Sequence, residues 1–414
     1  MSEPLDLDWI DATAGQYSAS GHDCPELGEA ISRWSQSRFR VAPPSHSAPS
    51  DQSALNQAGR RVAERLRQIT GHNETTIAHC HFNATGEQAL QELFVASRRS
   101  KLARSSPSSQ PLKCLSTVGS DHGHGVIGRM ASGRSESRDP QWPLVPGFDH
   151  VPWPELARRI DSATAMVLIA PIDRNDIAAR ADSKALNAIR AACDEYGASL
   201  VIDHREFAPM GGGFFWIHDS ITELLADAVM MSSGLCGAME SGLVVSGSSL
   251  AEAMSQLPLD RPSIAGREMV ACMIEESLER WLSSDLLATD TEDFAVALAG
   301  RLSAYESIRD LHVTGRVIGI ETDVPSADWM AVAQSCRLKV HAAGEFAVGL
   351  QPPLVMNATE SSDLIDRVVM VFDKILATES GTEADQAEAD QEQVFTEDEA
   401  SYPTPPIEDI QAET

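Results

Sequence analysis

Lysine is scarce in this chain, which has only Lys101, Lys113, Lys184, Lys339 and Lys374 among its 414 residues. Lysine and arginine together number 32 against 61 aspartates and glutamates, so the formal net charge is −29. Nucleic acids and anionic membrane surfaces are bound through basic patches. The sequence therefore predicts neither nucleic acid nor a membrane as a partner.

Long apolar runs and paired cysteines are also missing. No run of eighteen apolar residues is present, and the chain begins with the acidic stretch Met-Ser-Glu-Pro-Leu-Asp, so we expect no membrane span and no secretory signal. The seven cysteines show no paired short spacing, which is typical of a reducing compartment. These absences predict a cytoplasmic protein, and a hydrophobic fraction of 43% is enough to build a globular core.

A short apolar run ends on a carboxylate at Asp203. Residues 198–203 read Ala-Ser-Leu-Val-Ile-Asp, and the preceding segment has apolar residues at helical spacing until Gly197. This pattern predicts a helix followed by a buried parallel strand. Because ligands of open α/β sheets bind at the carboxyl ends of strands, we expect Asp203 to face a site.

A second turn with site character lies at residues 83–87, which read Asn-Ala-Thr-Gly-Glu between an apolar segment and a helical run. Backbone N–H groups at a helix start bind anions, so Thr85 and Gly86 are candidates for a phosphate cradle. An ordinary strand-to-helix turn would carry the same pattern, since a single glycine is weak support for a cradle.

Residues 191–203, together with 227–234 (Asp-Ala-Val-Met-Met-Ser-Ser-Gly), resemble the class III pyridoxal-phosphate aminotransferases of the acetylornithine and ornithine group. The resemblance implies that Asp203 is the partner of the cofactor's pyridinium nitrogen. It aligns Thr85 and Gly86 with the family's phosphate cradle, and Ser263 with a threonine that reaches the phosphate of the neighbouring subunit. Ser233 stands at the position of the family's Schiff-base lysine.

Further blocks at 121–133 and 146–153 extend the resemblance over about residues 8–377. It implies an α/β protein of the fold type I transferase class, with a large domain whose mainly parallel sheet lies between helices. We expect an N-terminal segment of the small domain at 1–41, the large domain at 42–300 and a small α+β C-terminal domain at 301–377. Residues 378–414 carry twelve carboxylates and no lysine or arginine, which predicts a disordered acidic tail.

Several family positions that contact the cofactor have changed. Asp121 replaces the aromatic residue that stacks on the ring, Arg205 replaces the valine on the opposite face, and Glu206 replaces the glutamine at the ring oxygen. Transamination requires a lysine amine for the imine and for proton transfer, and the hydroxyl of Ser233 forms no imine. The sequence therefore predicts a pseudoenzyme without a catalytic residue, in which pyridoxal phosphate is lost or held non-covalently. The class III resemblance implies a homodimer, or a heterodimer with an active relative, acting as a scaffold or regulator.

Other interpretations stay open on the sequence alone. The protein could hold pyridoxal phosphate non-covalently through Thr85, Gly86, Asp203 and Ser263, with residual or altered transaminase-type activity. It could reuse the old cleft for a small molecule or a divalent metal, although we predict no metal ligands. The resemblance places around this cleft His81, Asp121, His122, His124, Asp203, His204 and Glu206. Finally, Asp203 could be a structural salt-bridge partner of Arg205.

Overall fold

The computed structural model describes residues 8–13, 25–39, 50–104, 112–134, 147–173, 176–205, 207, 214–231, 234–237, 239–257, 261–284 and 292–397. Structural statements below concern these residues. None of the helices described there is long and apolar enough to cross a membrane.

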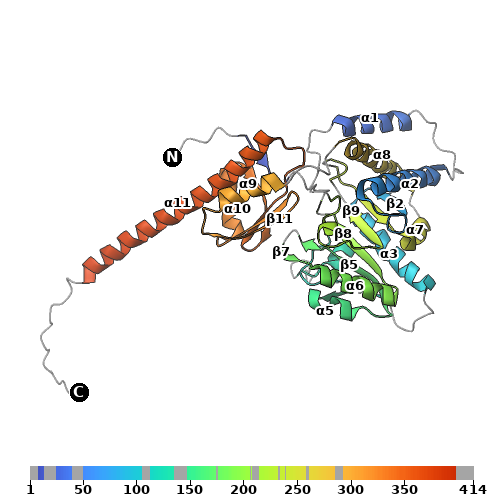
Figure 1. Cartoon of the computed structure of the whole chain (residues 1–414), viewed down its shortest axis with the longest axis horizontal. Coiled ribbons are helices and arrows are strands. Elements are labelled where there is room, and N and C mark those ends of the chain that lie inside the picture. Colours follow the sequence, from blue (N-terminus) through green and yellow to red (C-terminus); the bar gives the residue numbers. More distant parts are fainter. Residues whose placement is uncertain are drawn as a thin grey trace, which may run out of the picture.

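The larger part of the protein is built on a seven-stranded sheet (Figure 1). Its strands, in spatial order, are β2 (His79–Asn83), β10 (Gly242–Ser246), β9 (Ala228–Met231), β8 (Ser199–His204), β5 (Thr164–Ile169), β3 (Lys113–Thr117) and β4 (Phe148–Val151). The pairs from β9 to β4 are parallel, and β10 runs antiparallel to both of its neighbours. The predicted mainly parallel sheet is confirmed.

Helices cover both faces of this sheet, because its central strands are apolar on both sides. In β8, Leu200 and Ile202 pack into one hydrophobic cluster, whereas Val201 points into another on the opposite face. The first cluster receives α2 (Ser50–Thr70), α5 (Trp153–Arg159), α6 (Ser183–Tyr196) and α8 (Arg261–Ser283). The second receives α3 (Gly86–Arg104), α4 (Val126–Ala131) and α7 (Ser248–Ser255).

The unit formed by α6 and β8 matches its sequence prediction. The Asp182 side chain caps α6 by accepting a hydrogen bond of 2.6 Å from the backbone N–H of Ala185. Gly197 ends the helix in the left-handed region at φ 64°, where glycine has no Cβ penalty. The chain then turns directly into β8, whose carboxyl end carries Asp203.

A second, smaller α+β part follows, as predicted. Its antiparallel sheet has the order β11 (Ile308–Thr314), β12 (Val317–Thr322), β15 (Ala347–Leu350) and β14 (His341–Gly344). Three helices, α9 (Glu292–Leu302), α10 (Ser326–Ser335) and α11 (Ala358–Glu397), pack on this sheet around a core that includes Trp329 and Phe372. The hairpin of β6 (Ile172–Asp173) and β7 (Asp176–Arg180) from the larger part touches β14 and β15.

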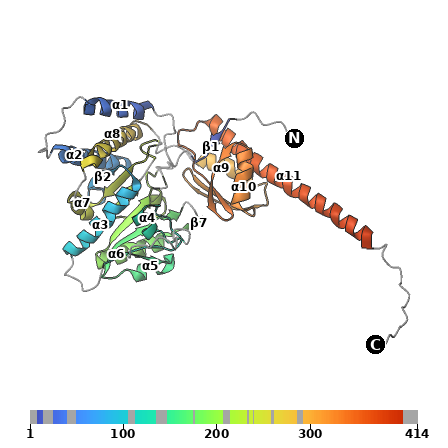
Figure 2. The same cartoon turned by 180° about the vertical axis from the view of Figure 1, so that it is seen from behind.

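The N-terminal segment is shared between the two parts. Strand β1 (Ile10–Asp11) pairs in parallel with β13 (Leu338–Lys339), so it belongs with the smaller part. Helix α1 (Pro25–Phe39) instead packs along α8 of the larger part, as Figures 1 and 2 show. The assignment of residues 1–41 to the small domain therefore fits only the first strand, and the four-part division of the chain stays a prediction.

Helix α11 differs from expectation at the C-terminal end. It continues to Glu397, past residue 377, and extends away from the body of the protein (Figure 1). Residues 383–393 are rich in alanine, glutamate and glutamine, which have high helix propensity and allow a helix without a packed face. The expectation of an unstructured tail is corrected for residues 378–397, and residues 398–414 lie outside the described part.

Candidate functional site

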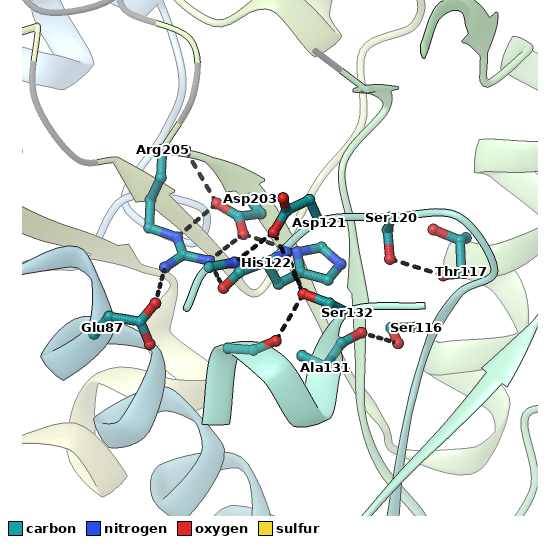
Figure 3. Close-up of polar contacts among 12 residues, drawn as sticks. Glu87, Ser116, Thr117, Ser120, Asp121, His122, Ala131, Ser132, Asp203 and Arg205 are labelled. Atoms are coloured by element: carbon teal, nitrogen blue, oxygen red, sulfur yellow. Dashed lines mark hydrogen bonds and ion pairs between the residues drawn. The ribbon is translucent and has the colours of Figure 1, made fainter. Parts of the chain in front are cut away.

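The candidate site lies at the carboxyl ends of the parallel strands, where Asp203 of β8 meets the loop that follows β3 (Figure 3). Asp203 is 6% exposed and His122, from that loop, is 1% exposed. The imidazole Nδ1 of His122 lies 2.9 Å from Oδ2 of Asp203. Since a carboxylate only accepts, this nitrogen carries the hydrogen. Asp203 lies at the end of β8 as expected, and its role at a ligand site stays a prediction.

Arg205 holds the same carboxylate through two further hydrogen bonds (Figure 3). Its Nε donates to Oδ1 at 2.9 Å and its Nη2 donates to Oδ2 at 2.7 Å, the fork geometry in which arginine binds carboxylates most strongly. Burial alone would raise the pKa of Asp203, but the charge of Arg205 and the hydrogen bonds from His122 and Arg205 outweigh it and hold that pKa well below its usual range. Asp203 is therefore a permanent anion with a permanent internal counter-ion.

The guanidinium of Arg205 also ties β8 to neighbouring segments. Its Nη2 donates to the backbone oxygen of His122 at 2.5 Å, and its Nη1 lies 3.9 Å from Oε1 of Glu87 in the first turn of α3. The Glu87 carboxylate fills the space beside the glycine-rich loop after β3. A Cβ at Gly123 would come within 2.0 Å of Oε1, and one at Gly125 within 2.3 Å of Oε2. A Cβ at either position would displace the Glu87 carboxylate, and Gly123 also has φ 102°, a backbone conformation that favours glycine.

The Asp121 side chain forms hydrogen bonds within its own loop. Its Oδ1 accepts a hydrogen bond of 2.9 Å from the backbone N–H of Gly123 and lies 3.4 Å from Oγ of Ser132. Ser132 in turn accepts from the backbone N–H of His122 at 2.8 Å and donates to the carbonyl of Gly128. Asp121 and Ser132 thus fix the loop that presents His122 to Asp203.

The predicted phosphate cradle is a helix cap. Thr85 Oγ1 accepts a hydrogen bond of 3.1 Å from the backbone N–H of Gln88, and Gln88 Oε1 accepts one of 3.3 Å from the backbone N–H of Ala84. This reciprocal pattern is close to a capping box, which satisfies the free N–H groups at a helix start. Gly86 is the first residue of α3 and is buried. The turn therefore fits the alternative of an ordinary strand-to-helix connection.

Comparison with known proteins gives a consistent set of relatives, although no family model matches the chain. The acetylornithine aminotransferase of Agrobacterium fabrum is 24% identical over 370 residues, covering 87% of this chain and 88% of that protein. The acetylornithine aminotransferase of Methanocaldococcus jannaschii is 22% identical over 386 residues, covering 90% and 92%. These relatives support the resemblance to class III aminotransferases over nearly the whole chain.

Solved structures of aminotransferases share the fold of this chain. The ornithine aminotransferase of Toxoplasma gondii superimposes with a TM-score of 0.74 at 16% identity, covering 90% of this chain and 87% of that one. An aminotransferase of Bacillus anthracis gives a TM-score of 0.73 at 17% identity, covering 88% and 89%. The expected fold type I architecture is thereby confirmed.

The described residues do not fit pyridoxal phosphate, the cofactor that the family resemblance implies. Each oxygen of Asp203 accepts two hydrogen bonds, all from His122 or from the side chain and backbone N–H of Arg205, so no free acceptor is left for a pyridinium N–H. At the start of α3, the Thr85 hydroxyl and the Ala84 N–H are engaged by Gln88. Ser233, at the family's lysine position, lies outside the described residues. Ser263 lies in the first turn of α8, and its side chain is not described.

No lysine has moved into this network. Four of the five lysine side chains donate hydrogen bonds to residues outside this network. The acceptors are the carbonyl of Tyr196 for Lys101, Asp161 for Lys113, Asp11 for Lys339 and Ser335 for Lys374. The fifth, Lys184, is an exposed residue in the first turn of α6. The described lysines therefore offer no replacement amine beside Asp203.

The histidines considered as a possible metal set point to different partners. His204 Nε2 lies 2.5 Å from Nδ1 of His218, His81 Nε2 lies 3.1 Å from Oγ of Ser246, and His124 is exposed. Glu206 lies outside the described part of the chain. Among the residues that the structure describes, no group of three or more histidine, cysteine, aspartate or glutamate side chains is arranged to hold a metal. Of the described members of that set, His122, Asp121 and Asp203 lie together where the loop after β3 meets the end of β8.

Sequence reasoning anticipated part of this network and missed the rest. The Asp203–Arg205 pair was one of the interpretations left open, and it is confirmed. The role of Ser132 was missed because a serine in a loop carries no distinctive pattern. His218 was also missed, although burial lowers its pKa to about 3 and that of its partner His204 to about 4. No sequence signal pairs His204 with His218, which lies fourteen residues along the chain.

Proposed function

We propose that this protein is a class III aminotransferase-type pseudoenzyme, which keeps the transferase fold without lysine-based transamination. It would act as a scaffold or a regulator rather than as a catalyst. The relatives named acetylornithine aminotransferase support the family assignment. The loss of transamination is inferred from this chain's own residues.

One observation carries the proposal. Arg205 binds both oxygens of Asp203 from within the chain, so the carboxylate that would serve a cofactor ring is already neutralised. Displacing a guanidinium from a buried carboxylate leaves two desolvated charges unpaired, at a cost of several kcal/mol (about 3–5). A cofactor ring would have to supply at least that much binding energy at this contact. The hydroxyl of Ser233 forms no imine, so no covalent bond adds to that binding energy.

A purified sample can test this with pyridoxal phosphate, absorption spectroscopy, borohydride reduction and intact-mass measurement. We expect the spectrum of the free aldehyde, no saturable change on titration and no reduced adduct. A near-visible aldimine band together with an adduct on one of the five lysines would contradict the proposal.

Saturable binding without an adduct would instead support the non-covalent holder of pyridoxal phosphate. Thr85, Gly86, Asp203 and Ser263 would then carry the cofactor, and the Arg205 contact would have to open. The capping role of Thr85 and the pairing of Asp203 both weigh against this second candidate.

Two matched variants separate the two features that the proposal holds responsible for inactivity, namely the missing lysine and the contact between Arg205 and Asp203. Ser233→Lys restores an amine while leaving the Arg205 contact in place, and Ser233→Lys with Arg205→Val restores the amine and removes the contact. We expect an adduct only in the double variant. An adduct in the single variant would mean that the missing lysine alone explains inactivity and that Arg205 does not block the site.

We further propose that the protein is a homodimer, or pairs with an active relative, because the resemblance spans nearly the whole of the described chain. Light scattering after size-exclusion chromatography would give the mass in solution. A monomer at micromolar concentration would overturn the homodimer and leave the heterodimer to be tested by co-expression. A cytoplasmic location stays a prediction from the sequence.

A further inference from the structure

A basic surface lies at the amino ends of the parallel strands, on the edge of the sheet opposite Asp203. Helices α3, α5 and α6 all end there, along the lower edge of the larger part in Figure 1. Two exposed apolar side chains stand among four exposed arginines. The basic surface is formed by Arg99, Leu102 and Arg104 of α3, Arg158 and Arg159 of α5, and Tyr196 of α6.

Contacts among the ends of these helices make the basic surface continuous. Lys101 of α3 is buried, and its Nζ donates to the carbonyl oxygen of Tyr196 at the end of α6. Burial lowers the pKa of Lys101, the charge of Arg104 lowers it further, and the charge of Asp161 opposes the lowering. Asp161 follows α5 by two residues and accepts a hydrogen bond of 2.9 Å from Lys113 at the start of β3. The ends of α3, α5 and α6 are therefore charge neighbours.

The arginines of the basic surface have no acidic partners in the part of the chain that the structure describes. Arg99 Nη1 contacts the carbonyl oxygen of Gln256 at 3.5 Å, and Arg104 Nε donates to the carbonyl oxygen of Ser100 at 3.3 Å. None of the four forms an ion pair with a described carboxylate, namely Arg99, Arg104, Arg158 and Arg159. Two carboxylates border the surface, Asp161 and Glu195, and Asp161 is already bound by Lys113.

Exposed arginines elsewhere in the described ranges do have acidic partners. Examples are the pairs Arg61–Glu275, Arg301–Asp366 and Arg309–Asp323. Acidic residues outnumber basic ones by 61 to 32, so an arginine on this protein has many carboxylates available. Four unpaired arginines on one surface therefore mark a place where an external acidic group can bind.

The apolar members of the basic surface point to a protein segment as the occupant. Leu102 is 59% exposed and Tyr196 is 38% exposed. Arginines in the last turn of a helix also complement the helix dipole, which accounts in part for Arg104. That role does not involve Leu102 or Arg99, which lies one turn earlier in α3. Arginine and tyrosine beside exposed apolar groups are typical of protein interfaces.

A complementary segment is present in the sequence of the same chain. Residues 398–414, called the acidic segment below, contain five carboxylates and no lysine or arginine. Three large apolar residues, Tyr402, Ile407 and Ile410, alternate with these carboxylates. These residues lie outside the described part of the chain. Their chemistry matches the basic surface in both charge and apolar character.

The direction of α11 favours a contact between two copies of the chain. Residues 378–397 continue α11 for about 30 Å, at 1.5 Å per residue. Figures 1 and 2 show that this extension leaves the smaller part on the side away from the larger part. The acidic segment therefore begins far from the basic surface of its own chain. The seventeen residues can span up to about 55–60 Å when extended, which is enough to reach a neighbouring molecule.

We propose that the acidic segment of one copy docks on the basic surface of a second copy. Its carboxylates pair with the exposed arginines, and its apolar side chains pack against Leu102 and Tyr196. The contact joins two different surfaces, so it is heterologous and can repeat from one copy to the next. It is separate from the proposed homodimer and does not depend on it.

A fluorescent peptide with the sequence of residues 398–414 tests the contact directly. Titration with the full chain, followed by fluorescence anisotropy, should give saturable binding with a dissociation constant on the order of 100 µM, since exposed ion pairs are individually weak. Raising the salt concentration from about 50 mM to about 500 mM should weaken binding about tenfold. A peptide with amides in place of its carboxylates should not bind measurably.

Two double variants locate the docking surface. Arg99→Gln with Arg104→Gln removes two cations at the end of α3, and Arg158→Gln with Arg159→Gln removes two at the end of α5. Each should weaken peptide binding about fivefold or more. All four side chains are on the surface, so both variants should fold, as circular dichroism would show. If one does not fold, the other decides.

Matched controls separate a specific contact from general charge attraction. Arg301→Gln with Arg309→Gln also removes two exposed cations, but from the smaller part, and should leave the affinity within about twofold. Leu102→Ser leaves the charge unchanged and should weaken binding several-fold, because it removes exposed apolar surface.

Sedimentation velocity of the full chain tests whether two copies associate through this contact. Between about 5 and 500 µM, the average mass should rise with concentration at low salt and fall back at high salt. The variant Arg158→Gln with Arg159→Gln should show a much smaller rise. A dimer of the class III kind would remain in both cases, so the failure of one proposal is distinguishable from the failure of the other.

Four outcomes would overturn the proposal. Absence of saturable peptide binding up to about 1 mM would exclude the contact. An equal loss in the Arg301→Gln with Arg309→Gln control would reduce it to general charge attraction. Equal affinity for polyglutamate of the same length would remove the acidic segment as the specific occupant. Peptide binding with a mass that does not depend on concentration would place the segment on its own chain.

Discussion

At the residue scale, Arg205 and Asp203 form a charged pair in a region with little water. Their side chains are 9% and 5% exposed, so each has lost most of its hydration. Two charges in such a position are stable only when they satisfy one another, and removing either leaves the other desolvated and unpaired. An exposed ion pair behaves differently, because solvent replaces the lost partner.

Replacing Arg205 with alanine should therefore lower the free energy of unfolding by about 3–5 kcal/mol. The matched control is Arg309→Ala, which breaks an exposed pair with Asp323 and should cost less than about 1 kcal/mol. Urea unfolding followed by circular dichroism would compare the two. Similar losses in both variants would mean that the Asp203 pair contributes no more than a surface contact.

Two buried histidines give the protein a dependence on pH. His204 and His218 stack at 4.8 Å, and burial lowers the pKa of His204 from 6.5 to about 4 and that of His218 from 6.5 to about 3. The unfolded chain then binds more protons than the folded chain below pH 6.5, so the stabilisation present at pH 7 is lost as the pH falls toward 4.

Between pH 7 and pH 4.5 we expect the free energy of unfolding to fall by a few kcal/mol (about 3–5). Urea titrations at several pH values would measure the slope. A variant with both His204 and His218 replaced by glutamine should show a shallower slope even though it is less stable at pH 7. An unchanged slope would assign the acid sensitivity to other groups.

At the element scale, the close approach of β10 to the start of α3 fixes the strand-to-helix turn. Gly242 of β10 pairs with Asn83 of β2, and a Cβ at Gly242 would lie 2.3 Å from the backbone oxygen of Thr85. That oxygen also accepts the N–H of Ala89 in the first turn of α3. Because the obstacle is backbone that the helix itself uses, a larger residue cannot be accommodated by a side-chain rotation.

Gly242→Ala should therefore destabilise the protein, by about 1–3 kcal/mol, through overpacking. Gly28→Ala is the matched control, since Gly28 lies on an exposed position of α1 where an added Cβ meets nothing within 4 Å. Alanine there should be neutral or stabilising by up to about 1 kcal/mol. Thermal unfolding of both variants measures the difference, and equal melting temperatures would refute the close approach.

At the scale of the whole molecule, the C-terminal helix divides into a packed half and an extension. The packed half reaches the core through Val368, Val371, Phe372 and Ile375. Beyond residue 377 the helix extends away from the body (Figure 2). The sequence of this extension carries many carboxylates. The fold therefore needs α11 only as far as Ile375.

Truncation after Ala377 should leave the melting temperature within about 2 °C of the full chain, since it keeps every core residue of α11 among those the structure describes. Truncation after Arg367 removes four of the six described core residues of α11 and should unfold the smaller part. Calorimetry of both truncated chains would separate the two outcomes. A large loss of stability on removing residues 378–414 would show that the extension contacts the body.

The local sequence determined most of the elements and the fold class. Helix α6, strand β8 and the turn at Gly197 follow from apolar spacing and from a glycine that tolerates positive φ, all of which act within a few residues. The order of the sequence blocks that resemble class III aminotransferases was enough to predict the transferase fold. The α11 extension was not predicted, because a composition rich in charged residues and alanine is typical both of disordered segments and of solvated helices.

The chemistry of the site was decided by tertiary structure. The sequence shows that Asp203 ends a strand and that Arg205 follows two residues later, but not whether the carboxylate serves a ligand or its neighbour. Only the folded chain brings His122 to Asp203 from eighty-one residues away, and only packing turns Thr85 into a helix cap. Such contacts depend on distances between segments remote in sequence, and the energy of a charge depends on how completely those segments exclude water.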